Sequence, residues 1–196
     1  MSRQRKTYLA PAQYLEIERR AETKSEYLRG EIFAMVGASR EHNLIAMNIA
    51  GSLWQQLKSK DCEVYCNDMR VWAVASGLYT YPDVVVVCGK PSFEDDYVDT
   101  LLNPIVVVEV LSPSTAGYDR GAKAGYYRSI ESLAEIVLVA QDAYRIEQYG
   151  RQPDGRWLIT DFISLDATVK LASIPCVLPL REVYDKVAPP DPVAPE

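Results

Sequence analysis

Two acidic residues, Asp83 and Glu109, stand beside apolar runs of the sequence, where a charge is costly. Asp83 immediately precedes Val84–Val87, and Glu109 follows Ile105–Val108. Both runs are short and rich in β-branched residues, which is typical of buried strands. A carboxylate beside a core strand destabilises the fold unless it is paired, hydrogen-bonded or bound to a metal ion. Two such acids on strands that could be neighbours indicate a polar site in the core.

Metal-assisted phosphate chemistry is one use for such a pair of acids. Mg²⁺ prefers oxygen ligands and keeps several waters while one or two carboxylates hold it. Asp83 and Glu109 meet that need, with a backbone carbonyl near Val110 as a third oxygen. Such an ion would bind a phosphate oxygen and lower the pKa of a bound water. Lys123 is the candidate to orient that water, and Asp119, four residues earlier, would share its helix face.

The segments before the first acid predict two helices and a hairpin. Pro11 to Arg20 reads as a short amphipathic helix with Tyr14, Leu15 and Ile17 directed inward. The text SEYLRGEIFAMVG predicts a hairpin that turns at Gly30. Ser39 is a plausible N-cap for a longer helix ending near Lys58. Its apolar residues recur at roughly helical spacing and predict packing on the sheet: Leu44, Ile45, Met47, Ile49, Leu53, Trp54 and Leu57.

The remaining segments predict further strands of a mixed sheet. The acidic stretch Lys90–Asn103 reads as a solvated loop, and Gly117–Ile130 reads as a helix. The other predicted elements are strands at Cys62–Cys66, Met69–Ala75 and Ile136–Ala140, a hairpin of Tyr144–Tyr149 with Trp157–Ile163, and a closing helix at Leu180–Val187. We therefore expect an α+β fold with an α/β-like core, in a single domain spanning residues 1–187, with a Pro-rich disordered tail at 188–196.

Composition excludes several classes of protein. The chain has 196 residues, a formal net charge of −6 and a sequence pI near 5.0. A non-specific nucleic-acid coat would normally be basic, so this class is disfavoured. The longest apolar stretches fall well short of the roughly 20 residues that span a bilayer, and the polar start MSRQRKTYLAPAQ has no apolar signal-peptide core. We expect a cytoplasmic protein without membrane contact.

The four cysteines do not form a zinc pattern. Cys62 and Cys66 are separated by three residues, while Cys88 and Cys176 stand alone. The chain has a single histidine, which makes a Cys/His metal site improbable. We interpret all four as reduced structural cysteines of a cytoplasmic protein.

Several sequence blocks together carry a resemblance to a known family. Pro82-Asp83, followed twenty-six residues after the aspartate by Glu109, resembles the PD-(D/E)XK nuclease superfamily. The wider blocks YPDVVVV, LLNPIVVVEVLSPST and YDRGAKAGYYRSI resemble a large bacterial family of small restriction-endonuclease-like proteins. The similarity includes SEYLRGEIFAM, the helix beginning near His42 and the text at Asn67–Val74. It covers most of residues 8–187.

The resemblance implies a fold and a set of site residues. The fold would be restriction-endonuclease-like: a mixed central sheet flanked by helices. Asp83 and Glu109 would bind Mg²⁺ or Mn²⁺. The superfamily's lysine two residues after the glutamate is replaced here by Leu111, but the resembling family carries a lysine on the following helix, which corresponds to Lys123. Glu26 and His42 also match family positions and would line the site.

The resemblance and the acids lead to three hypotheses of function. The first is a Mg²⁺-dependent endonuclease acting on DNA, expected to be a homodimer by analogy with nucleases that cut both strands. The second is a nuclease-fold protein that has lost catalysis and serves as a binding or regulatory module. The third is a metal-dependent phosphoesterase acting on RNA or a small substrate. An intact pair of acids favours the first, and the absence of the usual lysine favours the second.

Each candidate residue also has a purely structural reading. Asp83 could cap a turn, and Glu109 could pair with an arginine such as Arg70. Lys123 could be a solvated helix lysine. Hydrogen bonding at the helix start is an alternative for His42, and a surface charge on the hairpin is an alternative for Glu26. The geometry of the fold decides among these readings.

Overall fold

The computed structural model describes residues 8–188 and is built around a six-stranded mixed sheet. Its β-branched runs give strands that are buried on both faces at the centre of the sheet, because layers cover both sides. In spatial order the strands are β11 (Trp157–Phe162), β10 (Ile146–Arg151), β9 (Glu135–Ala140), β8 (Val106–Leu111), β6 (Val84–Cys88) and β3 (Cys62–Cys66).

The register of three central strands brings the two acids to one edge of the sheet. Strand β6 pairs antiparallel with β8, and Val84 lies opposite Val108. Asp83 and Glu109, each the next residue toward that edge, therefore lie close together. Strand β9 runs parallel to β8, and such a pair requires a crossover connection. The helical segment 116–127 is part of that crossover.

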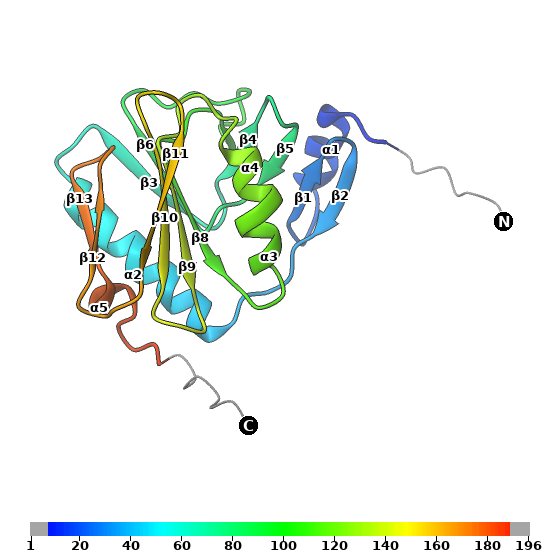
Figure 1. Ribbon diagram of the computed structural model, residues 1–196. Helices are drawn as coiled ribbons and strands as arrows, with labels where there is room; N and C mark the ends of the chain where they lie inside the picture. The colour runs from blue at the N-terminus through cyan, green and yellow to red at the C-terminus, as the bar shows by residue number, and fades with distance from the viewer. Residues whose placement is uncertain (1–7, 189–196) are drawn as a thin grey trace.

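A long helix and a small hairpin cover one face of this sheet. Helix α2 (Arg40–Leu57) begins at the predicted cap, since the Ser39 side chain accepts a hydrogen bond from the His42 N–H. Its buried residues pack on the valines of β6 and β8. The remaining elements of this layer are β12 (Thr168–Leu171), β13 (Cys176–Pro179) and α5 (Leu180–Val183) (Figure 1).

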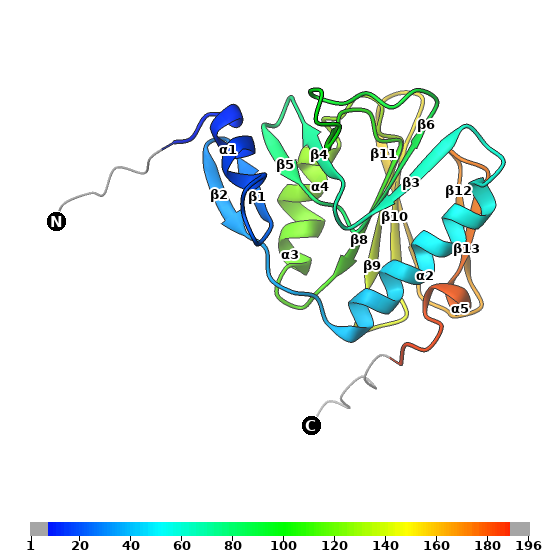
Figure 2. The ribbon, with the colours of Figure 1, turned by 180° about the vertical axis from the view of Figure 1, so that it is seen from behind.

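The opposite face carries the crossover helix and a second sheet. The crossover consists of α3 (Ala116–Tyr118), a π-helical turn (Asp119–Lys123) and α4 (Ala124–Tyr127), and Figure 2 shows it between β8 and the second sheet. In spatial order that five-stranded sheet contains β2 (Glu31–Ala34), β1 (Ser25–Leu28), β5 (Leu78–Thr80), β4 (Arg70–Ala73) and β7 (Thr100–Leu101).

Helix α1 (Pro11–Glu18) is anchored to the second sheet through tyrosines. Tyr14 stacks on Tyr27 with ring centroids 5.0 Å apart, and Tyr79 lies 5.4 Å from Tyr14. Aromatic contacts at such distances stabilise a core beyond the area that they bury. The hairpin β1–β2, which turns at Gly30 as predicted, is thereby fixed beside the crossover helix.

The predicted mixed sheet with flanking helices is confirmed, and the predictions that failed did so for physical reasons. Ile17, Met47 and Trp54 fit the helical spacing but are all largely exposed. Periodicity places them near the apolar stripe, whereas α1 and α2 bury only the side directed at the sheets. The closing helix is also shorter than predicted, because its last helical residue is Val183.

The stretch Lys90–Asn103 is more than a solvated loop. It contains β7, which pairs parallel with β4. Asp99 also accepts hydrogen bonds from Arg19 of the segment after α1, at 2.8 Å from Nε. The acidic composition suggested solvent, but these charges have partners that are distant in the sequence.

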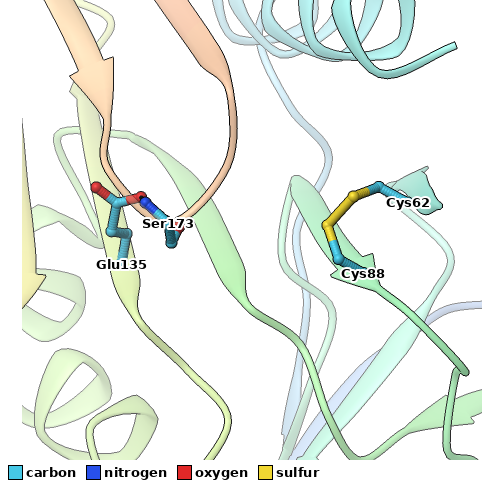
Figure 3. The surroundings of a disulfide bond; sticks show 4 residues. All are labelled: Cys62, Cys88, Glu135 and Ser173. Carbon is cyan, nitrogen blue, oxygen red and sulfur yellow. Dashed lines mark hydrogen bonds between the residues drawn. A yellow bond between two sulfur atoms is a disulfide. The ribbon is translucent and has the colours of Figure 1, made fainter. Parts of the chain in front are cut away.

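The prediction of four reduced cysteines is wrong for two of them. Cys62 and Cys88 form a disulfide between β3 and β6, where the two residues are direct register partners (Figure 3). Cys66 and Cys176 are free thiols, exposed and buried respectively. Spacing along the chain could not reveal this pairing, since it depends on strand register. The same figure shows Glu135, whose carboxylate accepts hydrogen bonds from the N–H and hydroxyl of Ser173.

Two further expectations concern the membrane and the chain end. Within residues 8–188, no helix combines the length and apolar character needed to cross a bilayer. Apart from its first residue, Ala188, the predicted Pro-rich tail lies outside the described residues.

Candidate active site

The Asp83 carboxylate is held in place by one backbone and one imidazole contact. It lies directly before β6, and its Oδ2 accepts a hydrogen bond of 2.7 Å from the Val110 N–H. The same oxygen lies 3.3 Å from Nε2 of His42, the third residue of α2. The backbone N–H of His42 serves the helix start, while its side chain reaches Asp83. The helix-start reading of His42 therefore applies to its backbone, and the site reading applies to its side chain.

Glu109 receives two donors on one oxygen. The Tyr127 hydroxyl donates to Oε1 at 2.5 Å, and the Lys123 Nζ lies 2.8 Å from the same atom. The proposed pairing with Arg70 is wrong, because Arg70 lies against Asp99 instead, with Nη2 3.0 Å from Oδ2. Since both donors come from the crossover helix, β8 and that helix together define the orientation of the Glu109 side chain.

Lys123 is buried among carboxylates. Its Nζ lies 2.8 Å from Oε1 of Glu26 on β1 and 3.7 Å from Oδ1 of Asp119. Glu26 also accepts a hydrogen bond of 2.5 Å from the Thr80 hydroxyl of β5. The readings of Lys123 as a solvated lysine and of Glu26 as a surface charge are therefore both wrong. The second sheet thus contributes an ion-pair partner of the lysine, so the hairpin β1–β2 is part of the site.

The crossover helix presents three site residues on one side. Asp119, Lys123 and Tyr127 are spaced by four residues, and all three are buried. The turn from Asp119 to Lys123 is π-helical, a local widening that often occurs at functional sites. The i, i+4 relation expected for Asp119 and Lys123 is confirmed by their contact.

Burial and charge oppose each other in this cluster. Burial raises the pKa of Glu109 to about 8, the Lys123 ammonium partly offsets this, and the charges of Asp83 and Asp119 add to it. Burial likewise raises the pKa of Asp119. Burial disfavours the Lys123 ammonium, but Glu109, Tyr127, Glu26 and Asp119 outweigh it and raise the Lys123 pKa well above 10.5. The cluster thus has one cation for several acids and would gain from a second cation.

The free carboxylate oxygens of the two acids are suitable ligands for a hard divalent ion. Within residues 8–188, no hydrogen bond or ion pair reaches Oδ1 of Asp83 or Oε2 of Glu109. Each acid therefore keeps one oxygen free, and oxygen ligands suit Mg²⁺ or Mn²⁺. No group of three or more His, Cys, Asp or Glu side chains that could hold a metal exists in this range. An ion would rely on Asp83, Glu109, the backbone near Val110 and water.

All five sequence-derived site residues lie in this region, and two contributors were missed. His42 contacts Asp83, while Glu26, Lys123 and Glu109 form one chain of contacts. Tyr127 as a partner of Glu109 and Thr80 as a partner of Glu26 were not predicted. Tyr127 lies four residues after Lys123, so helical spacing could have indicated it, whereas nothing in the sequence singles out Thr80.

Comparisons with known proteins agree with this architecture. The family Uma2, described as "Putative restriction endonuclease", matches residues 11–181. The uncharacterized protein sll1609 of Synechocystis sp. (strain ATCC 27184 / PCC 6803 / Kazusa) is 38% identical over 164 residues, covering 84% of this chain and 93% of that protein. The uncharacterized protein slr1290 of the same organism is 35% identical over 180 residues, covering 92% and 93%.

A solved structure has the same fold. It is the crystal structure of a putative nuclease belonging to DUF820 from Anabaena variabilis ATCC 29413, with a TM-score of 0.76. The match covers 92% of this chain and 99% of that chain at 16% sequence identity. At this identity the likeness concerns the arrangement of helices and strands.

Proposed function

This chain belongs to the Uma2 family, and we propose that it is a metal-dependent endonuclease that hydrolyses DNA phosphodiester bonds. The observation that carries the proposal is the buried Lys123 ammonium in contact with Glu109, together with one free carboxylate oxygen on Glu109 and one on the neighbouring Asp83. A binding module would gain little from such a costly arrangement. The family description and the nuclease-fold neighbour support the same class of enzyme.

Asp83 and Glu109 are the residues that would hold Mg²⁺ or Mn²⁺, with the Val110 carbonyl as a third oxygen. Bound there, the ion would polarise the scissile phosphate and lower the pKa of a bound water. The Val110 N–H and the His42 imidazole orient Asp83. Tyr127 and Lys123 fix Oε1 of Glu109, which leaves Oε2 for the ion. The chain therefore supplies two oriented carboxylates without a rearrangement of their strands.

Lys123 would act on the water and the phosphate. An ammonium group has three donors, and Glu26 and Glu109 account for two of them at 2.8 Å. The third donor can orient the attacking water or neutralise charge that develops on the phosphate oxygens. Because Glu26 and Thr80 come from the second sheet, they position the lysine without touching the substrate.

The test combines metal binding and DNA nicking. Calorimetry with Mg²⁺ and Mn²⁺ compares the wild type with Asp83→Ala/Glu109→Ala, and plasmid nicking follows on the same samples. The double variant should bind no metal and should nick no DNA. Asp166→Ala, which removes an exposed acid that pairs with Arg181, is the matched control and should behave as the wild type.

Each alternative function corresponds to a distinct outcome. If the wild type binds no divalent ion at millimolar concentration, the acids are structural and the binding-module hypothesis takes over. Metal binding without cleavage of DNA, but with cleavage of RNA or a small phosphodiester, would identify a phosphoesterase instead. We further propose a homodimer that cuts both strands, which sedimentation analysis and the ratio of linear to nicked plasmid would test.

A further inference from the structure

A polar cavity lies on the same edge of the central sheet as the acids. It has a volume of about 240 Å³ and is lined by Leu111, Ser112, Arg120, Ala140 and Arg145, among others. Leu111 and Ala140 are register partners at the carboxyl ends of the parallel strands β8 and β9. Glu109 lies two residues before Leu111 on β8, so the cavity lies beside the strand that carries this acid.

Arg120 is fixed in this cavity but only partly satisfied. Its Nε donates to Oε1 of Glu147, a buried acid of β10, at 2.7 Å. Within residues 8–188, no acceptor reaches Nη1 or Nη2 of Arg120. A guanidinium has five N–H donors in a planar fork, and the four on the Nη atoms thus remain available. Glu147 therefore holds the arginine in place while leaving its two Nη atoms free.

Arg145 adds a second guanidinium to the same cavity. Its Nε lies 3.5 Å from Oε1 of Glu147, and its Nε and Nη2 each donate to Asp161 at 3.1 Å. Its Nη1 has no acceptor among the described residues. One buried carboxylate thus serves two arginines, both of which line the cavity and keep unused donors.

We propose that this cavity binds the phosphate next to the scissile phosphate on the same nucleic acid strand, with Arg120 as the principal ligand of that phosphate. The inference rests on the proposed nuclease function and extends it to substrate positioning. Arg120 follows Asp119, and both lie on the crossover helix with Lys123. One short helix would therefore set the spacing between the reacting phosphate and its neighbour.

Acidic groups near the cavity limit the strength of this site. Asp142 is exposed at the rim and disfavours an anion. Free phosphate should therefore bind weakly, while a strand held at the acids presents its next phosphate at high effective concentration. The cavity should therefore contribute to the binding of DNA more than to the binding of mononucleotides.

The test measures DNA binding with Arg120→Gln, using Arg181→Gln as a matched control on an exposed arginine that pairs with Asp166. Anisotropy of a fluorescein-labelled DNA duplex, in Ca²⁺ and over a series of salt concentrations, gives the affinity and its salt slope. Arg120→Gln should weaken binding about 5- to 20-fold and reduce the salt slope by about one. In plasmid nicking, KM should rise while kcat stays within about twofold of wild type.

A second variant separates lost folding from lost binding. Arg120→Gln removes a close partner of the buried Glu147, whereas Arg120→Gln/Glu147→Gln replaces the ion pair by two neutral amides. A thermal melt shows which variants are folded, and the folded double variant should also weaken DNA binding. If both folded variants keep the wild-type affinity and salt slope while the wild type cleaves DNA normally, the proposed phosphate site is wrong and the nuclease function stands. A wild type that neither binds nor cuts DNA would overturn the nuclease function as well.

Discussion

Two clusters of charged side chains join distant parts of this chain, and they differ in charge balance. The Lys123 cluster consists of Lys123 with Glu26, Glu109 and Asp119. It has three acids for one cation, its four side chains are buried, and it lies beside Asp83, a further acid. Its members come from β1, β8 and the crossover helix.

The Arg19 cluster has as many cations as acids. Arg19 contacts Asp95 and Asp99, each with an N···O distance of 2.8 Å, and Arg70 contacts Asp99 at 3.0 Å. Its members tie the segment after α1 to the stretch before β7 and to β4. The aspartates are partly exposed, so solvent shares in their stabilisation.

The pKa shifts in the two clusters have opposite directions. The Arg19 hydrogen bonds lower the pKa of Asp99 well below its usual value, against the effect of burial and with further help from Arg70. Burial raises the pKa of Glu109 to about 8 despite Lys123. Carboxylates of the first kind are already satisfied and hold the fold together. An acid that is disfavoured as an anion gains from another cation, and perturbation of this kind is typical of functional sites.

Removing the central cation of each cluster is the strongest test of this difference. Lys123→Met leaves buried carboxylates without their partner, which should lower the free energy of unfolding by about 3–5 kcal/mol. Nicking should fall by at least about 100-fold, since the ammonium would also act on the substrate. Arg19→Met removes partly exposed hydrogen bonds to charged groups, should cost about 1–3 kcal/mol and should leave nicking unchanged.

Urea denaturation and plasmid nicking on the same preparations measure both effects. Thermal melts give the fraction of each variant that is folded at the assay temperature, so that activity is compared between folded proteins. Equal loss of nicking in folded Lys123→Met and Arg19→Met would remove the distinction between a functional and a structural cluster.

The stability of the metal-free protein should respond to pH with opposite signs in the two clusters. Glu109 has an ordinary pKa of 4.5 and a folded pKa of about 8, so between these values the folded state holds the extra proton. Its contribution to the free energy of unfolding therefore falls as pH rises, by roughly 2–3 kcal/mol from pH 5 to pH 7. Asp99 has a lowered folded pKa, so its contribution is present above pH 3.8 and is lost as pH falls below it.

Denaturation in EDTA with Glu109→Gln and Asp99→Asn isolates these two contributions. The stability difference between wild type and Glu109→Gln should decline from pH 5 to pH 7. For Asp99→Asn, the corresponding difference should decline as pH falls from 5 toward 2. A pH-independent difference for Glu109→Gln would show that the fold does not raise the pKa of Glu109. The two clusters would then not differ in the direction of their pKa shifts.

The two clusters also show what the sequence can and cannot predict. The runs Val84–Val87 and Ile105–Val108 predicted neighbouring buried strands, because β-branched composition is a local property. Once two acids lie beside such strands, their proximity follows from the pairing. Ser39 as a helix cap was equally local. The position of Lys123 on the helix after the Glu109 strand indicated it as a site residue, and the family resemblance added Glu26 and His42.

The contacts that the sequence analysis missed all depend on how distant elements meet. Arg19 and Asp99 are 80 residues apart, and neither belongs to a pattern that names the other. The Cys62–Cys88 disulfide requires the register of β3 on β6. The hydrogen bond from Tyr127 to Glu109 requires the position of the crossover helix over β8. Polar contacts between distant elements follow no period along the chain, so they become visible only when the fold is known.

Two tyrosines, one at each cluster, provide the most closely matched comparison, with the smallest expected effects. The Tyr127 hydroxyl donates to Oε1 of Glu109 at 2.5 Å, and the Tyr79 hydroxyl donates to Oε1 of Glu94, beside the Arg19 cluster, at 2.7 Å. Both rings are buried. Replacement by phenylalanine removes one tyrosine–glutamate hydrogen bond in each case, and each variant should lose about 1–2 kcal/mol of stability. Only Tyr127→Phe should slow nicking, by about 10-fold, because only Glu109 would hold the ion.

Metal affinity separates orientation of Glu109 from general packing. With Tyr127→Phe, Lys123 alone would fix Oε1 of Glu109, so calorimetry should show weaker Mg²⁺ binding alongside the slower nicking. Tyr79→Phe should bind Mg²⁺ as the wild type does. If both variants lose stability equally and neither changes metal affinity, then Tyr127 only packs against Glu109. In that case Lys123 is sufficient to orient the acid, and the functional part of the cluster is smaller than the set of residues in contact.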